Sequence, residues 1–339
     1  MGTAMVTAVR GDIKAEQLGI TLPHEHLFIN LMRDYRLAGL LNDPEVMAEE
    51  VDLFSASGGG TIVDVTTAEI TRGANGGLLD DEADRDIAFD DGTRSRANVL
   101  ALLELSERTG VNVVAGTGHY RDPYLDKDWV DRMSTDRIAE QIVRDIEEGF
   151  PGTSVRAGVI GEVGSDKWYI SAAEERCFRA AGRAHRRTGA TITTHATRWP
   201  VGLAQVELLL SEGVDPGCII IGHTDTVPDI DYAVRLAHQG VYVQLDLFFE
   251  CMKGGVVNER TLKTRVDMIM HLVRNGFEDS ILLSHDICLK DSLACNGGPG
   301  FTFILTHVAR ALAQAGLDAE LVTRFQRENP QAALSAGSK

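Results

Sequence analysis

Short apolar runs recur eight times along this chain, and longer stretches with helical periodicity lie between them. Runs of this length are typical of buried parallel strands, and the intervening stretches have the spacing of crossover helices. Eight strand–helix units are the number that closes a TIM (β/α)8 barrel, so we predict an α/β fold with a single barrel of this kind. The predicted strands lie within residues 19–29, 60–66, 111–117, 157–164, 190–197, 218–225, 241–248 and 280–287, and the clearest helical patterns cover residues 96–108, 135–149, 172–188 and 262–275.

The length of 339 residues leaves a choice between one barrel and two smaller domains. Because no linker rich in proline, glycine or serine interrupts the eight units, we expect one domain over residues 1–339. A doubly wound sheet is the alternative, but no GxGxxG follows an early strand. Residues 1–18 precede the first barrel strand. The turn formed by Gly11 and Asp12 predicts a short N-terminal hairpin extension that covers the bottom of the barrel.

The balance of charges excludes several kinds of partner. The chain has 33 Lys and Arg residues against 50 Asp and Glu residues, and its net charge of −17 repels phosphate backbones and anionic lipids. We therefore expect a small-molecule substrate, with neither a nucleic acid nor a membrane as partner. No segment reaches the ~20 apolar residues of a spanning helix, and residues 1–19 lack the pattern of a signal peptide, so we expect a cytoplasmic protein.

Polar residues end or interrupt the predicted strands at the positions where a barrel carries its chemistry. The carboxyl ends of all eight strands meet at one face, and catalytic groups come from those ends. His24 and His26 are two residues apart, so on a strand both side chains point to the same face. A polar group that follows an apolar run costs several kcal/mol to bury without a partner. The candidate residues are His24, His26, Asp64, Glu162, His195, His223, Asp246 and Asp286.

A shared metal cluster accounts for these residues more simply than separate explanations do. Imidazole and carboxylate groups suit divalent metals such as zinc, manganese, cobalt and iron, of which we expect zinc first. Six ligands exceed what one tetrahedral zinc takes, so we predict two divalent cations per chain. In this prediction one cation is held by His24, His26 and Asp286 and the other by His195 and His223, with Glu162 bridging the two.

The predicted cluster indicates hydrolysis. A water that bridges two cations loses a proton near neutral pH and becomes a nucleophile. Asp286 lies beside that water in the predicted arrangement, so it is the natural acceptor of the proton and its later donor to the leaving group. A barrel that keeps its metal but has lost catalysis is the alternative from a different class of protein.

Four motifs resemble those of one known family. They are HEH at residues 24–26, GHTD at 222–225, SHD at 284–286 and ENP at 328–330. Together they are similar to the motifs of the phosphotriesterase family of the amidohydrolase superfamily, over a match that runs from residue 22 to about residue 333. The resemblance implies a (β/α)8 barrel that hydrolyses its substrate with two metal ions. It also implies metal ligands at the six positions given above.

Two departures from the family pattern point to its phosphotriesterase-related branch. Phosphotriesterases and acyl-homoserine lactonases bridge their metals with a carboxylated lysine from the fourth strand, whereas residues 159–164 contain no lysine. Glu162 resembles the bridging glutamate of that branch. Asp246 is followed by Leu247 and Phe248 where acyl-homoserine lactonases have an arginine, and this sequence resembles the animal phosphotriesterase-related proteins, for which amide hydrolysis is known.

The reaction that we expect from these features is the opening of a lactone or a carboxylic ester. A small cyclic ester needs little help for its leaving group, and such substrates recur in the family. Hydrolysis of a small N-acyl amide, as by an N-acetyltaurine hydrolase, is the alternative. Promiscuous phosphotriesterase activity is expected to accompany either reaction, because both transition states place charge beside the metals.

Four residues are candidates for substrate binding. Tyr120 is one because a tyrosine at its position approaches the metals in the family, while Arg198 and Lys253 lie on loops after strands and suit an anionic group. Phe248 is a candidate for an apolar wall. The long loops at 250–259 and 288–300 follow late strands, where barrels build their substrate pockets. Family relatives are commonly dimers, which makes a homodimer possible.

Overall fold

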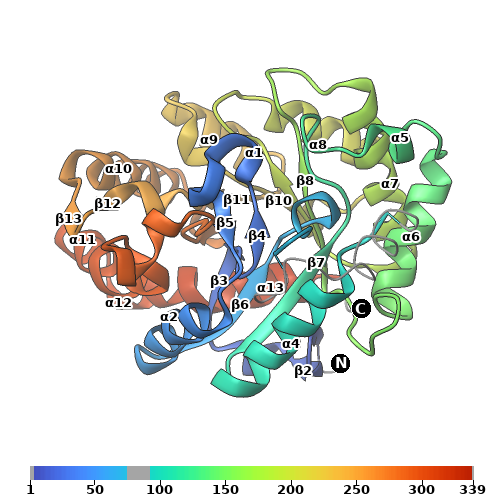
Figure 1. Ribbon diagram of the computed structural model, residues 1–339. Helices are drawn as coiled ribbons and strands as arrows, with labels where there is room; N and C mark the ends of the chain where they lie inside the picture. Colours follow the sequence, from blue (N-terminus) through green and yellow to red (C-terminus); the bar gives the residue numbers. More distant parts are fainter. Residues whose placement is uncertain (1–3, 75–91, 338–339) are drawn as a thin grey trace.

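Eight parallel strands form the centre of the computed structural model, which describes residues 4–74 and 92–337. Their order is β14-β11-β10-β9-β8-β7-β6-β3, so spatial neighbours are also successive barrel strands along the chain. His24 O accepts a hydrogen bond from Asp286 N at 3.2 Å, which brings the end of the last strand back beside the first. This arrangement confirms the predicted (β/α)8 barrel (Figure 1). The barrel strands are β3 (Ile20–Glu25), β6 (Gly59–Asp64), β7 (Asn112–Thr117), β8 (Val159–Gly164), β9 (Ile192–His195), β10 (Ile219–Ile221), β11 (Tyr242–Leu245) and β14 (Ile281–Leu283).

Most of the strands are shorter than the apolar runs that predicted them, because the polar residues at the end of a run turn out of the sheet. The run at 218–225 gives a strand of only three residues, and the run at 280–287 does the same. His223 has a φ of 55° and Asp286 a φ of 58°, and this left-handed backbone cannot continue a strand. Both side chains therefore lie on loops at the carboxyl end of the barrel.

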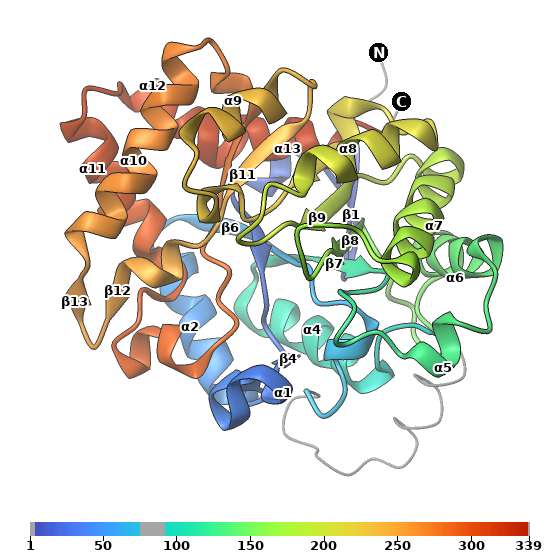
Figure 2. The same cartoon turned by 90° about the horizontal axis from the view of Figure 1, so that it is seen from above.

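Helices cover the outside of the barrel, as the view from above shows (Figure 2). The helix after β8 begins where predicted, because Ser171 and Glu174 form a capping box, and it ends at Gly189, which has a φ of 74°. The helix after β13 begins three residues earlier than predicted because Asn258 caps it through Thr261 N. The helices are α1 (Met32–Tyr35), α2 (Pro44–Ala56), α4 (Arg96–Thr109), α5 (Lys127–Val130), α6 (Thr135–Glu147), α7 (Ala172–Thr188), α8 (Gly202–Ser211), α9 (Ile230–Ala237), α10 (Glu259–Arg274), α11 (Ala309–Gln314), α12 (Ala319–Thr323) and α13 (Asn329–Ser335).

The predicted N-terminal hairpin is present and packs against the lower end of the barrel. Its two strands pair in antiparallel register, and Val6 is buried together with Leu18. Both side chains join a cluster with Val63 of β6, Val114 of β7 and Leu334 of α13. Strand β2 and helix α13 accordingly lie at the lower end of the barrel in Figure 1. The shorter strands are β1 (Met5–Ala8), β2 (Gly11–Lys14), β4 (Ile29–Asn30), β5 (Leu40–Leu41), β12 (Met252–Lys253) and β13 (Val256–Val257).

Strand alternation separates apolar side chains that face the outer helices from those that face the barrel interior. Ile62 packs in the large cluster that includes the outer helices, whereas its neighbour Val63 packs in the inner cluster at the bottom of the barrel. Apolar side chains thus fill the amino-terminal end of the interior. The polar residues gather at the opposite end, where the strands finish.

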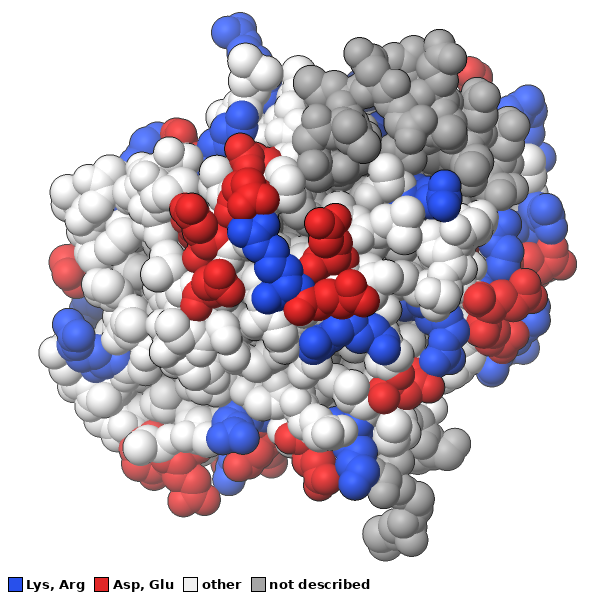
Figure 3. Space-filling model, turned by 60° about the horizontal axis from the view of Figure 1, so that its bottom comes forward, with Lys and Arg blue, Asp and Glu red and all other residues white. Residues whose placement is uncertain are grey.

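The outer surface mixes acidic and basic side chains. Figure 3 shows the lower face, on which red and blue groups are interspersed rather than separated by sign. Within residues 4–74 and 92–337, no helix has both the length and the apolar character that crossing a membrane requires. The single domain over residues 1–339 and the homodimer stay predictions.

Replacing Leu18 with alanine tests whether the hairpin region supports the barrel. Leu18 is fully buried, so Leu18→Ala is expected to lower the free energy of unfolding by about 2–5 kcal/mol. Chemical denaturation followed by circular dichroism measures the change. The control is Leu37→Ala, whose side chain is 65% exposed and whose loss is expected to change stability by less than about 0.5 kcal/mol. Equal effects of the two substitutions would contradict the packing role of Leu18.

Candidate metal centre

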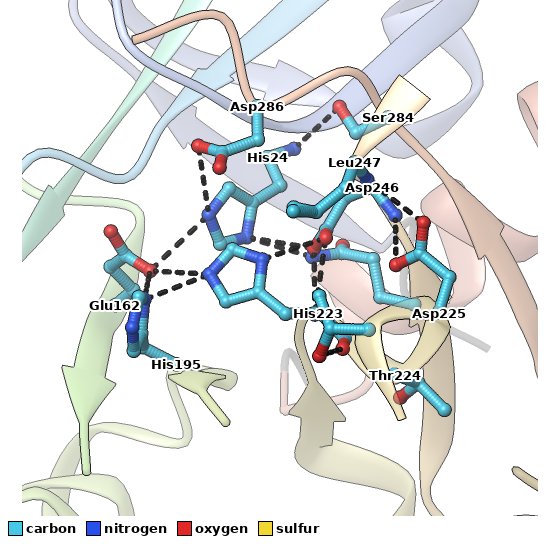
Figure 4. Close-up of polar contacts among 12 residues, drawn as sticks. His24, Glu162, His195, His223, Thr224, Asp225, Asp246, Leu247, Ser284 and Asp286 are labelled. Atoms are coloured by element: carbon cyan, nitrogen blue, oxygen red, sulfur yellow. Dashed lines mark hydrogen bonds and ion pairs between the residues drawn. The ribbon is translucent and has the colours of Figure 1, made fainter. Parts of the chain in front are cut away.

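The six predicted ligands come together at the carboxyl end of the barrel, around the side chain of Glu162. All of them except His26 are labelled in Figure 4. Glu162 Oε2 lies 3.3 Å from His24 Nε2, 3.1 Å from His195 Nδ1 and 3.4 Å from His223 Nε2. Glu162 Oε1 lies 3.4 Å from His26 Nε2. One buried carboxylate therefore contacts imidazoles from three separate strand ends. The function of these residues as metal ligands stays a prediction.

Asp286 completes the cluster on the side of the last barrel strand. Its Oδ1 atom lies 3.2 Å from His26 Nε2 and 3.9 Å from His24 Nε2. Three sets of residues bring one ligand atom each to within 4.8 Å of one another. These sets are His24 with His26 and Asp286, Glu162 with His195 and His223, and His24 with His223 and Asp246.

The residues present fit a divalent metal. His24 Nε2 and His195 Nε2 are buried and have no hydrogen-bond partner in the described part of the chain. Burial would lower the pKa of His26, but hydrogen bonds to Asp286 and Glu162 raise it to about 10. Burial and the charge of His223 lower the pKa of His195 to about 3, which leaves a neutral imidazole. The cluster thus attracts positive charge and offers the nitrogen and oxygen donors of a transition-metal site.

Groups behind the histidines fix which nitrogen faces the cluster. Asp246 Oδ1 accepts a hydrogen bond from His223 Nδ1 at 2.7 Å. The hydroxyl of Thr66 lies 2.9 Å from His26 Nδ1, and the side-chain amide of Gln244 lies 2.8 Å from His24 Nδ1. In Figure 4 the rings of His24 and His223 lie between Glu162 and Asp246. Because each Nδ1 atom is occupied in this way, the Nε2 atoms of these three rings point inward.

Glu25 joins the first strand to the loop that carries Asp286. This fully buried carboxylate accepts hydrogen bonds from Ser284 Oγ at 2.8 Å, His285 N at 2.7 Å and Ile287 N at 2.8 Å. His285 Nδ1 lies 2.9 Å from the same carboxylate, so His285 faces away from the cluster. Glu25 was not among the residues predicted from the sequence. The available signal was a carboxylate between two predicted ligands, which strand alternation turns away from them and which burial obliges to find partners.

A cavity of about 950 Å³ opens above the cluster. Its floor includes His26, His195, His223 and Asp286. Two of the four predicted substrate-binding residues, Tyr120 and Arg198, line its wall. The hydroxyl of Tyr120 lies 3.3 Å from His195 Nδ1, at the edge of the predicted ligand set.

The other two predicted substrate-binding residues do not line this cavity. Residues 248–251 form a 3-10 turn, which rotates each side chain about a third of a circle from the last. Leu247 and Phe249 therefore face the cavity, while Phe248 is fully buried beneath it. Lys253 lies in the β12–β13 hairpin, where its side chain is 86% exposed and its Nζ atom is 3.9 Å from Asp291 Oδ2. That short hairpin carries Lys253 away from the cavity wall.

The fold and the side-chain cluster together define a class of protein. Four histidines and two carboxylates that converge at the carboxyl end of a (β/α)8 barrel are the donor set of a metal-dependent hydrolase. Residues 4–80 and 92–334 match the model of the Phosphotriesterase family. The chain belongs to this family, which confirms the resemblance found in the sequence.

Similar proteins extend along nearly the whole chain. The phosphotriesterase homology protein of Escherichia coli is 30% identical over 319 residues, which cover 92% of this chain and 96% of that protein. The N-acetyltaurine hydrolase of Danio rerio is 28% identical over 367 aligned positions that cover 96% of each chain. The crystal structure of a lactonase from Listeria monocytogenes matches with a TM-score of 0.81 and 27% identity, covering 98% of this chain and 99% of that one.

The Glu25→Gln variant tests whether Glu25 positions Asp286. An amide places N–H groups against buried donors, so we expect the loop after β14 to shift and the affinity for zinc to fall by about 10-fold or more. Competition with a chromogenic chelator measures that affinity. Glu50→Gln is a matched control, because buried Glu50 likewise accepts hydrogen bonds from Ala294 N and Cys295 N, which lie farther along the same connection and outside the cluster. If both variants bound zinc like the unmodified protein, Glu25 would have no positioning role.

Zinc loading is expected to release protons. The pKa of His26 is raised to about 10 in the metal-free protein, so His26 is protonated at pH 8 and must lose its proton to bind a metal. Affinity for zinc should therefore rise with pH up to about pH 10. Calorimetry in two buffers of different ionisation enthalpy measures the release, which is expected to be about one proton smaller in His26→Ala. A binding heat that does not depend on the buffer would contradict the raised pKa.

Proposed function

We propose that this protein binds two divalent cations and hydrolyses a lactone or a carboxylic ester. The observation that carries the proposal is the central position of Glu162, whose two carboxylate oxygens lie 3.1–3.4 Å from four imidazoles. A carboxylate with histidines on both sides is suited to bridge two cations. Zinc is our first choice of metal, with manganese, cobalt and iron as the alternatives. His24, His26 and Asp286 would hold one cation, and His195 and His223 would hold the other, with Glu162 shared between the two groups.

The chemistry that bound divalent cations supply is Lewis acidity, which lowers the pKa of water and polarises a carbonyl group. Asp286 supplies the proton transfers. Its carboxylate lies on the floor of the cavity, and burial raises its pKa, as suits a group that takes up and returns a proton. Asp286 accepts a proton from the attacking water and returns it to the leaving oxygen. One water is consumed, and a carboxylic acid and an alcohol are formed.

Tyr120 is placed to assist from the cavity wall. Burial raises the pKa of its phenol well above the usual value, so the hydroxyl stays protonated at neutral pH. That hydroxyl donates a hydrogen bond to an oxygen of the substrate that lies over His195. Tyr120 thereby orients the acyl group toward Asp286.

Hydrolysis of a small N-acyl amide is the second candidate function. The similarity to the lactonase from Listeria monocytogenes supports the first candidate, and the similarity to N-acetyltaurine hydrolases of several animals supports the second. Both reactions use the same residues, and they differ in the leaving group that Asp286 must protonate. An amine requires that proton more strongly than an alkoxide does.

A hydrolysis screen of the zinc-loaded protein distinguishes the two candidates. Lactones, aryl esters and N-acyl amides are tested, and the acid released is measured at constant pH. We expect turnover of at least one class, and Asp286→Asn is expected to lose it by about 10²–10⁴-fold while the folded structure is retained. The matched control is Asp291→Asn, whose carboxylate is exposed on the loop that follows. Near-normal turnover by Asp286→Asn would remove Asp286 from the proton transfers, and no turnover of any class by fully loaded protein would contradict the proposed function.

A further inference from the structure

The cavity wall is rich in arginine although the chain is strongly acidic. Five arginines line the cavity of a protein whose net charge is −17. Two of the five are each paired with two carboxylates that also line the cavity. Arg121 pairs with Asp34 at 2.6 Å and with Asp166, and Arg265 pairs with Asp225 at 2.6 Å and with Glu250 at 2.7 Å.

The other three arginines have no such partner. Within residues 4–74 and 92–337, no carboxylate lies within 4.0 Å of the guanidinium groups of Arg33, Arg198 and Arg260. The only cavity-lining carboxylate in that range without an arginine partner is Asp286, which faces the histidines. The five arginines of the cavity wall therefore face four wall carboxylates besides Asp286, which leaves a surplus of one positive charge, and a cation bound at the floor would add to it.

Arg198 is held in place by the loops of two predicted ligands. It follows His195 by three residues, and its backbone N donates a hydrogen bond to Thr226 Oγ1 at 2.7 Å. The Thr226 hydroxyl in turn donates to His223 O at 2.7 Å. Arg198 has a φ of 66°, a conformation that costs a residue with a side chain about 1–2 kcal/mol. The chain thus keeps an arginine at a strained position that would suit glycine, tied to both neighbouring strand ends.

Arg198 also lies within electrostatic reach of the reacting end of the cavity. Burial raises the pKa of the Tyr35 phenol, the charges of Cys288 and Asp286 raise it further, and the Arg198 guanidinium opposes the rise. Arg198 and Asp286 consequently act with opposite sign on Tyr35, which also lines the cavity. A volume of about 950 Å³ is near the upper end of the ~300–1,000 Å³ usual for ligand pockets, so it leaves room beyond a small acyl group.

We infer that Arg198 binds an anionic substituent, a carboxylate or a sulfonate, at the end of the substrate that does not react. A guanidinium group recognises such oxyanions with paired hydrogen bonds, and Arg33 and Arg260 add attraction of the same sign. The substrate is then a small acyl compound with a negative charge on the far side of the scissile bond. The identity of the cleaved bond rests on the proposed function. The binding of an anion by Arg198 does not depend on it.

Two pairs of compounds that differ only in charge test this inference on the zinc-loaded protein. The amide pair is N-acetyltaurine and its neutral methyl sulfone analogue. The lactone pair is 5-oxotetrahydrofuran-2-carboxylate and its carboxamide. Dissociation constants are measured by calorimetry for compounds that are not hydrolysed, and kcat and KM are measured for those that are. The anionic member of at least one pair is expected to bind about 10-fold more tightly than its neutral partner.

Variants assign the preference to a residue. Arg198→Ala is expected to weaken binding of the anionic compound about 10–100-fold and of the neutral one less than about 2-fold, and Arg198→Lys is expected to restore part of the difference. Lys253→Ala is the matched control, because it removes an exposed cation outside the cavity wall and is expected to leave both constants unchanged.

The outcomes separate the anion site from the reaction. Hydrolysis without any preference for the anionic member, or equal losses for both members in Arg198→Ala, would overturn the anion site and leave the proposed function in place. A preference that depends on Arg198, with none of the four compounds hydrolysed, would support the anion site and count against the proposed reaction.

Discussion

The buried carboxylate of Glu162 lies within 3.4 Å of four imidazoles, and this contact sets the requirements for the rest of the site. A buried negative charge without compensation costs several kcal/mol, so its surroundings must supply positive charge. His26 and His223 do so through protons when no cation is bound, because hydrogen bonds to carboxylates raise the pKa of both imidazoles. The four imidazoles come from the first, fifth and sixth barrel strands, so only a closed barrel brings them to one carboxylate.

Residues that never touch the substrate hold this arrangement. Asp246, Thr66 and Gln244 fix three imidazole rings from behind, and Glu25 fixes the loop of Asp286. Most of these supports lie on strands or at their ends, so the floor of the site is rigid. The cavity wall is built differently, from loops and helix ends that carry the five arginines, of which only Arg121 and Arg265 are held by ion pairs. In the proposed function, chemistry and substrate choice would therefore lie in different parts of the fold.

The sequence was sufficient to predict the barrel and the members of the cluster, because both produce a local pattern in the sequence. Each strand is an apolar run that a polar residue ends, and a buried polar residue is conspicuous there. The residues of the cavity wall follow no such local pattern. Phe248 was misplaced because a tight turn decides which of three neighbouring apolar residues faces inward, and Lys253 because residues 252–257 fold back as a hairpin. The pairing of Arg121 with Asp34 joins residues 87 positions apart, which no periodicity reveals.

The apolar cluster at the bottom of the barrel determines how ligands can reach the site. Val6, Leu18 and Leu334 fill the amino-terminal end of the interior, so the mouth at the carboxyl end serves metal, substrate and product alike. A cation bound at the floor would exchange with solvent through that same mouth. An anionic product held at the mouth would delay entry of the next substrate and slow the loss of the metal. The time for which the metal stays bound would then depend on how fast the product leaves.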